Sequence, residues 1–164
     1  MKRIVIYYSL TGNTRQAAAA VAEALHADLL ALEPVRPIPE KGAASILTGG
    51  GQATFGVCPP LKPLSLDPAG YDEIILGTPI WAGKCAAPVR TFLKGNPLCR
   101  RVTAVFTLSG SGKNDGCLRA LARWLPNVRH TLSLCDANVP QHTENAARLA
   151  AFTAEVLGGS AQAQ

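Results

Sequence analysis

Short apolar runs alternate with segments of helical periodicity along most of this chain. Runs rich in apolar and β-branched residues occupy positions 2–8, 28–35, 72–78, 101–108 and 128–135. The segments between them place apolar residues three or four positions apart, which predicts helices over residues 15–26, 86–93, 117–125 and 144–157. Strands that alternate with helices indicate a parallel sheet that is covered on both faces.

We therefore expect an α/β fold, a three-layer sandwich in which helices flank a five-stranded parallel sheet. Five strands without a dinucleotide-type repeat favour the order 2-1-3-4-5 over the six-strand order, although the pattern alone does not prove it. Pro34 suggests that the second strand lies at the edge of the sheet. A single domain should cover residues 1–159, with Gly158 and Gly159 ending the last helix and residues 160–164 forming a frayed tail.

One long segment, residues 36–70, does not fit a plain connection in a compact domain. Prolines begin it at Pro37 and Pro39 and recur near its end, and a glycine-rich run at 49–56 lies between them. We interpret this segment as an insertion before the third strand whose glycines make it adaptable. The sequence pattern does not indicate the function of this segment.

Charge and composition narrow the function classes. The 164 residues include 16 Lys and Arg against 11 Asp and Glu, a formal charge of +5, but the basic residues are scattered. No basic stripe is interleaved with aromatic residues, so we predict no nucleic-acid binding and a mild preference for anionic ligands or acidic partners. No apolar run approaches the roughly 20 residues that span a bilayer, and we interpret no signal peptide.

Five cysteines occur singly, without any CxxC spacing. This usage indicates reduced thiols and a cytoplasmic location rather than a disulfide framework. Most should be small buried hydrophobes. Cys85 and Cys117 lie near predicted helix N-termini, where a lowered thiol pKa could make either one reactive.

The first strand is followed by a turn rich in hydroxyl groups that leads directly into a helix. The first amides of a helix lack intrahelical partners, and the positive end of the helix dipole lies there. Gly12 allows a tight turn, Asn13 is a plausible N-cap, and the hydroxyls add donors. This combination predicts an anion site that suits a phosphate. The candidate residues are Ser9, Leu10, Thr11, Gly12, Asn13 and Thr14.

Two further loops end at the same edge of the predicted sheet. In the order 2-1-3-4-5, strands 1, 3 and 4 are neighbours, and ligands bind outside the carboxyl ends of such strands. Trp81 offers a flat surface, and the glycines of the other loop let backbone amides approach a ring edge. A phosphate site beside a flat-ring site describes a mononucleotide, flavin mononucleotide (FMN) in particular. The loops contain Thr78, Pro79, Ile80, Trp81, Ala82 and Gly83, and Ser109, Gly110, Ser111 and Gly112.

The first loop resembles the phosphate loop of the flavodoxin family, whose usual form is (S/T)-x-T-G-x-T. Residues 9–14 match every fixed position, residues 77–81 resemble the second flavin loop, and residues 107–112 resemble the third more loosely. The resemblance covers nearly the whole chain in element order. It implies a flavodoxin-like fold, FMN phosphate on residues 9–14, the flavin ring along residues 78–83, and its pyrimidine edge at residues 109–112.

This chain departs from typical flavodoxins in its basic charge, its long segment 36–70, and its third loop without an aromatic residue. Phe55 could cover the open flavin face from elsewhere. The leading interpretation is an FMN-binding electron-transfer protein that exchanges electrons with a redox partner protein. The alternative is an FMN-dependent oxidoreductase that takes hydride from NAD(P)H and reduces quinones or similar small acceptors. Either would act as a monomer or homodimer.

Each of these three segments also has a simpler interpretation. Residues 9–14 could be only a helix start, Trp81 a core or surface tryptophan, and residues 110–112 a simple turn. In that case the chain would be a flavin-free interaction module. The three histidines are dispersed, without the spacing of metal ligands, so we predict no metal site.

Overall fold

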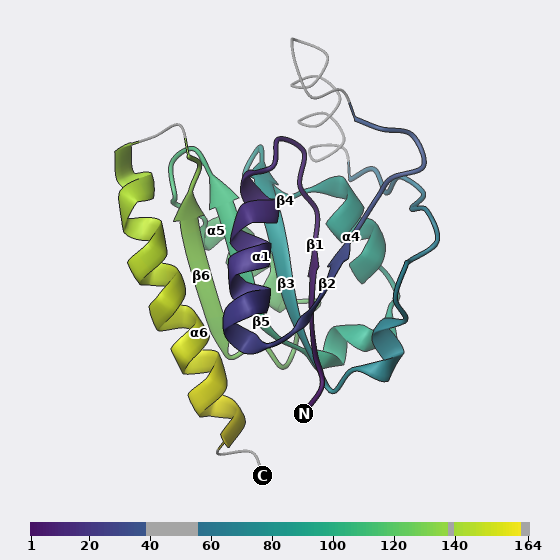
Figure 1. Ribbon diagram of the computed structural model, residues 1–164. Helices are drawn as coiled ribbons and strands as arrows, with labels where there is room; N and C mark the ends of the chain where they lie inside the picture. Colours follow the sequence, from purple (N-terminus) through teal and green to yellow (C-terminus); the bar gives the residue numbers. More distant parts are fainter. Residues whose placement is uncertain (39–55, 138–139, 162–164) are drawn as a thin grey trace.

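The computed structural model describes residues 1–38, 56–137 and 140–161, with side chains to residue 159. Its centre is a parallel sheet in the order β2-β1-β3-β5-β6, with a short β4 paired antiparallel to β3 (Figure 1). This is the predicted order 2-1-3-4-5, with β4 added. The strands are β1 (Arg3–Tyr7), β2 (Asp28–Ala31), β3 (Glu73–Trp81), β4 (Lys84–Cys85), β5 (Val102–Ser109) and β6 (His130–Cys135).

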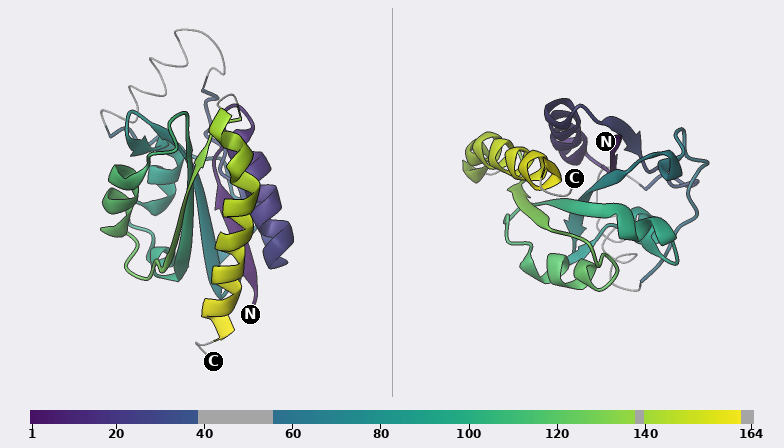
Figure 2. Two further views of the ribbon diagram at one scale, coloured as in Figure 1. Left: turned by 90° about the vertical axis from the view of Figure 1, so that its left-hand side faces the viewer. Right: turned by 90° about the horizontal axis from the view of Figure 1, so that it is seen from below.

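Helices cover both faces of the sheet, as the alternating pattern predicts. In Figure 2, α1 and α6 lie against one face and α4 and α5 against the other. The α-helices are α1 (Asn13–Leu25), α4 (Ala87–Leu93), α5 (Asp115–Ala122) and α6 (Asn145–Ala161). Short 3₁₀ turns are η2 (Pro68–Gly70), η3 (Pro97–Arg101) and η4 (Pro140–Glu144).

The two faces of β1 supply two separate cores. Successive side chains of a strand point to opposite faces. Ile4 and Ile6 therefore join the core under α4 and α5, whereas Val5 and Tyr7 join the core under α1 and α6. All four are buried, which explains why the sequence of this strand is apolar without alternation.

A buried carboxylate joins three strands at the amino end of the sheet. Glu73, 3% exposed, accepts a hydrogen bond from Arg3 Nε at 2.7 Å and another from Thr103 Oγ1 at 2.6 Å. These residues begin or lie near the starts of β3, β1 and β5. A buried charge is tolerated only when it is paired and hydrogen-bonded, so this cluster fixes the end of the sheet opposite the predicted loops.

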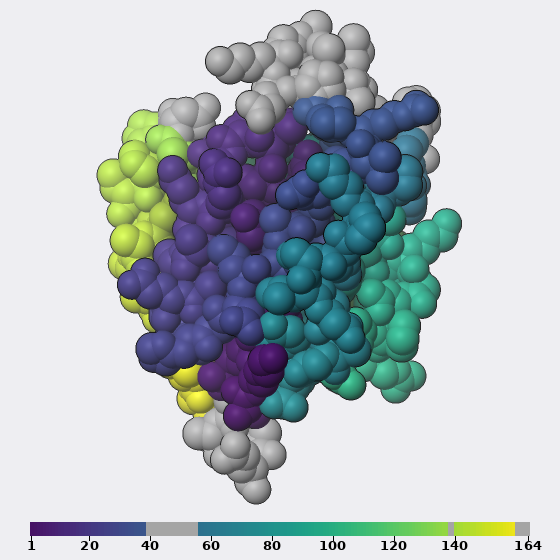
Figure 3. All heavy atoms as spheres, turned by 45° about the vertical axis from the view of Figure 1, so that its right-hand side comes forward, coloured from purple at the N-terminus to yellow at the C-terminus, as the bar shows by residue number. Residues whose placement is uncertain are grey.

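Several element boundaries differ from the sequence prediction. The second strand ends at Ala31 rather than 35, although it does lie at the sheet edge. Beyond it, Val35 N donates to Pro60 O at 2.9 Å and Lys62 N to Glu33 O at 2.8 Å. The segment after β2 therefore runs beside the segment before η2 on the molecular surface (Figure 3). Helix α5 begins at Asp115, two residues earlier than predicted, and ends at Ala122 rather than 125.

The prediction that Gly158 and Gly159 end the last helix was wrong, because α6 continues to Ala161. A Cβ at Gly159 would lie 2.8 Å from His130 Nε2, so this glycine allows α6 to pack closely against the start of β6. Glycine in a helix costs only about 1 kcal/mol relative to alanine. Burial of Phe152 and Val156 on the same helix outweighs that cost. The remaining tail residues, 162–164, lie outside the described residues.

None of the helices in the described ranges has both the length and the apolarity that a bilayer crossing requires.

We predict that Gly77→Ala destabilises the protein by about 1–3 kcal/mol, the usual cost of overfilling a packed core. Gly77 pairs with Tyr7 on one side and Phe106 on the other, and an added Cβ would overlap the Phe106 ring. Urea unfolding followed by circular dichroism measures the change. Gly116→Ala in α5 is the control, since its Cβ would meet nothing within 4 Å. Equal stability of the two variants would contradict the packing described here.

Candidate functional site

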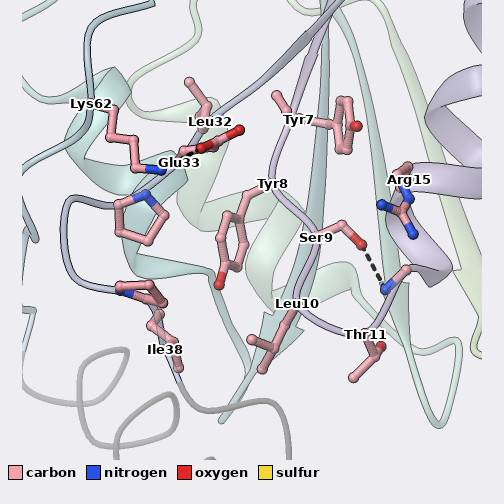
Figure 4. A pocket seen from close by; sticks show the side chains of 14 residues that line it. Tyr7, Tyr8, Ser9, Leu10, Thr11, Arg15, Leu32, Glu33, Ile38 and Lys62 are labelled. Atoms are coloured by element: carbon pink, nitrogen blue, oxygen red, sulfur yellow. Dashed lines mark hydrogen bonds and ion pairs between the residues drawn. The ribbon is translucent and has the colours of Figure 1, made fainter.

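The loop between β1 and α1 closes on itself and leaves the start of the helix open. Ser9 Oγ accepts a hydrogen bond from Gly12 N at 3.1 Å, and Gly12 has φ 97°, a conformation that glycine adopts readily (Figure 4). The first helical bond runs from Gln16 N to Gly12 O at 3.0 Å. The amides of residues 13–15 thus precede the bonded part of the helix, as an anion site requires.

Asn13 is not the N-cap that the sequence predicts. Gly12 occupies that position, and no side chain caps the helix. Asn13 instead donates from Nδ2 to Asp136 Oδ1 at 3.4 Å, which connects this loop to the end of β6. The amides at the start of α1 are therefore not capped by a side chain. Such an end is a better receptor for an external anion than a capped one.

Hydroxyl and cationic side chains surround this helix start. Thr11 is exposed, whereas Thr14 is only 2% exposed and belongs to the interior. Arg15 folds back toward the loop, since a Cβ built on Gly12 would lie 3.6 Å from its Nη2. Burial raises the pKa of Tyr7, and the Arg15 charge partly opposes that rise. Arg15 therefore adds a positive charge to the dipole of α1.

A cavity of about 350 Å³ opens on the β2 side of the loop (Figure 4). Tyr8 points into this side of the loop, away from Tyr7 and Arg15. Lys62 lies at its rim, where Nζ pairs with Glu33 Oε2 at 2.8 Å. The other two candidate loops lie on the β3 side of the first loop. Residues 9–12 therefore border this cavity on one side and face those two loops on the other.

The second candidate loop is largely strand. β3 continues to Trp81 and turns through Ala82 and Gly83 into β4, with Ile80 opposite Cys85 and Trp81 opposite Lys84. Ala82 has φ 48° and Gly83 φ 74°, the positive values that a tight two-residue hairpin turn needs. The expectation of a loop over residues 78–83 is corrected accordingly. Only its last two residues form a turn.

The hairpin places Trp81 against the first loop. The rings of Tyr8 and Trp81 meet edge to face, with centroids 5.6 Å apart and planes at 89°. Edge-to-face packing of this kind is favourable and fixes both rings. Trp81 is partly buried, and it packs with Ile80 against the core under α4 and α5.

Thr78 and Pro79 support the hairpin from within. Thr78 is fully buried, and its hydroxyl accepts from Ala86 N at 3.1 Å and donates to Pro79 O at 2.9 Å. Pro79 O also accepts from Ala86 N, at 3.2 Å. These bonds hold the entrance of α4 against the end of β3.

The third loop is held by a polar network. Ser109 Oγ accepts from Gly112 N at 3.1 Å and donates to Asn114 Oδ1 at 2.6 Å. Asn114, 2% exposed, donates in turn to Thr107 Oγ1 at 2.9 Å. Gly112 has φ 66°, and a Cβ there would lie 2.5 Å from Cys135 Sγ. This close approach explains why glycine is needed at that position.

Gly110 and Ser111 form the exposed tip of this loop. Ser111 Oγ accepts from Lys113 N at 3.2 Å, so its hydroxyl also orders the turn.

The structure brings the three candidate loops to one edge of the sheet. They lie at the carboxyl ends of β1, β3 and β5, which are adjacent and parallel, and Asp136 at the end of β6 contacts the first loop. The predicted site residues did not include Tyr8, Arg15, Lys62, Asn114 or Asp136. Arg15 could have been found, because a cation directly after Thr14 must lie in the first turn. The others reach the site only through the fold, and Phe55 lies outside the described residues.

Solved structures provide the comparison. A flavoprotein from Lactobacillus acidophilus NCFM in complex with FMN is 20% identical, with 90% of this chain and 97% of that chain covered and a TM-score of 0.64. A flavodoxin, WrbA-like protein from Agrobacterium tumefaciens is 22% identical over 99% of both chains, with a TM-score of 0.60. Oxidised flavodoxin 2 from Bacillus cereus is 19% identical, covering 94% and 99%, with a TM-score of 0.57. This chain has a flavodoxin-like fold. No family model matches the sequence.

The flavodoxin-like fold that the sequence resemblance implies is thus confirmed. At these levels of identity the likeness concerns the fold, and it does not test the individual residues of the candidate site.

We predict that Asn114→Ala destabilises the protein by about 1–3 kcal/mol. The change leaves the buried Thr107 hydroxyl without its donor and Ser109 without its acceptor, and an unsatisfied buried polar group costs about that much. Thermal unfolding measured by circular dichroism gives the change. Lys113→Ala, at the exposed neighbouring position, should stay within about 0.5 kcal/mol of the wild type. A stable Asn114→Ala protein would mean that the network does not hold the third loop.

Proposed function

We propose that this protein binds FMN at the carboxyl edge of β1, β3 and β5 and transfers electrons through it to a partner protein. One observation carries the proposal. An uncapped helix start, a partly buried tryptophan and a glycine-hydroxyl loop lie at the carboxyl ends of three neighbouring parallel strands. This is the switch point where nucleotides bind in such sheets. The FMN bound to the L. acidophilus flavoprotein supports the choice of ligand.

The residues present suit this cofactor. The amides of residues 13–15 and the Thr11 hydroxyl would hold the phosphate, and Arg15 would add a charge-assisted bond. Ser9 and Gly12 would shape that loop. Trp81, fixed by Tyr8, would flank the flavin ring, with Pro79 and Ile80 behind it.

The remaining positions would act through the backbone. The turn at Ala82 and Gly83 would lie along the ring, and the loop at residues 109–112 would offer amides to its polar edge. The Thr78 and Thr14 side chains are buried, so their part would be structural. Bound FMN supplies one- or two-electron chemistry, and the protein supplies binding, orientation and electrostatics.

A second function is favoured by one observation. The described third loop, residues 109–112, carries no aromatic side chain over the ring position. An open ring face would admit NAD(P)H and then a quinone or similar acceptor. The protein would in that case be an FMN-dependent oxidoreductase.

We predict that Arg15→Gln weakens FMN binding about tenfold and leaves riboflavin binding unchanged. Tenfold corresponds to about 1.4 kcal/mol, close to the lower end of the roughly 1.5–3 kcal/mol that a hydrogen bond to a charged group contributes. Flavin fluorescence quenching measures both affinities. Arg119→Gln, on α5 at the other face of the sheet, is the matched control and should bind both ligands like the wild type. Equal losses for FMN and riboflavin would place the phosphate elsewhere, and no FMN binding at micromolar concentration would end the proposal.

For the FMN-loaded protein we predict slow NAD(P)H oxidation with quinone when no reductase is present, and fast reduction once a flavodoxin reductase is added. Stopped-flow absorbance of the flavin follows both reactions. Rapid multiple turnover without any reductase would instead establish the oxidoreductase. That outcome would leave the FMN site itself intact.

A further inference from the structure

A second cavity, on the α4 and α5 face, contains two cysteines that lie against each other. Cys85 belongs to β4 and Cys117 to α5, two elements that pack against each other, and the two thiols are close enough to interact. Both are buried, at 6% and 2% exposure, but both line a cavity of about 350 Å³. A cavity of this size admits a small reagent to the sulfur atoms.

A buried arginine faces the same pair. Arg90, from α4, is 8% exposed and lines the same cavity as the two thiols. The interaction with Cys117 lowers the pKa of Cys85 below its usual value, and the Arg90 charge adds to this against the opposing effect of burial. The same interaction and burial raise the pKa of Cys117. Of the two thiols near predicted helix N-termini, Cys85 is therefore the one with the lowered pKa.

The other cysteines have different surroundings. Cys99 Sγ donates to Leu93 O at 3.3 Å, and burial raises the pKa of Cys99. Cys58 Sγ donates to Gly56 O at 3.7 Å on a partly exposed segment. Cys135 packs beside Gly112 in the third loop. Among the described cysteines, the Cys85 and Cys117 pair therefore combines a nucleophile, a second thiol and a fixed cation.

We propose that Cys85 and Cys117 are a peroxide-sensitive thiol pair that forms a reversible intramolecular disulfide. The Cys85 thiolate attacks one oxygen of hydrogen peroxide, the O–O bond breaks, and with one proton taken up the products are a sulfenic acid and water. The Cys117 sulfur then attacks the Cys85 sulfur, and the hydroxyl leaves as a second water. Two thiols lose two electrons to one peroxide, and a dithiol reductant reverses the change.

The disulfide would join two elements of the candidate cofactor site. β4 is the second strand of the hairpin that carries Trp81, and α5 begins directly after Asn114, which anchors the third loop. Oxidation would therefore tie the hairpin to the helix behind that loop. The thiol chemistry itself does not depend on whether FMN binds.

Peptide mapping of the full-length protein tests the proposal. The five cysteines fall in five different tryptic peptides, and those of Cys85 and Cys117 are residues 85–90 and 114–119. The reduced protein is treated with one equivalent of hydrogen peroxide, alkylated, digested and analysed by mass spectrometry. We expect the 85–90 and 114–119 peptides to be disulfide-linked, and dithiothreitol to separate them.

Variants assign the two roles. Cys117→Ser should stop at a Cys85 sulfenic acid that dimedone labels, whereas Cys85→Ser should leave Cys117 reduced. Arg90→Gln should slow alkylation of Cys85 by iodoacetamide about tenfold, the effect of a one-unit rise in thiol pKa on the thiolate fraction. Cys99→Ser, a buried cysteine outside the pair, is the control and should form the disulfide like the wild type.

Two results would overturn the proposal, and neither requires a variant to fold. One is that both thiols stay reduced at a peroxide concentration that oxidises Cys58. The other is that Cys85 links to a different cysteine.

Discussion

Parallel hydrogen bonding of β1 to β3 and of β3 to β5 determines where every other part of this molecule lies. The pairing aligns three carboxyl strand ends at one edge, so segments far apart in the sequence become neighbours, as in the pairing of Arg3 with Glu73 and of Ile75 with Ala104. Because alternate side chains of these strands enter two separate cores, a one-residue shift of register would move each side chain into the wrong core. Glu73 and its partners hold the opposite end of the same three strands. The position of the candidate site therefore depends first on how the strands pair, and only then on the conformation of each loop.

The loops at that edge are shaped by their own polar groups. Ser9 closes the first loop onto Gly12, and Ser109 closes the third onto Gly112, by the same side-chain to amide hydrogen bond at 3.1 Å. Each closure uses the oxygen of a serine hydroxyl as the acceptor. What remains for a ligand is chiefly backbone amides, one exposed threonine and an arginine. A site of this kind is ordered before binding, which reduces the entropy lost when a ligand is held.

The two faces of the sheet carry different chemistry. On one face, α1 presents its amino end and Arg15 to the first loop. On the other, α4 and α5 enclose Cys85, Cys117 and Arg90 beneath the hairpin of β3 and β4. Trp81 and Cys85 belong to the same hairpin, so a change of redox state at the thiols and a ligand at the sheet edge would act on one small structural unit. The long segment before β3 adds Lys62 to the β2 side of the same edge.

The sequence by itself determined the alternation of strands and helices and located three segments at strand ends, because burial on both faces leaves continuous apolar runs that are easy to recognise. It favoured the observed strand order without proving it. It also indicated an anion site at residues 9–14, since a helix start has the same unpaired amides in any fold. It could not show that Trp81 lies in a strand against Tyr8, or that Gly159 serves helix packing rather than helix termination. It could not bring Cys85 to Cys117 either. Those features depend on contacts between residues far apart in the chain, and only the tertiary structure decides which of those residues meet.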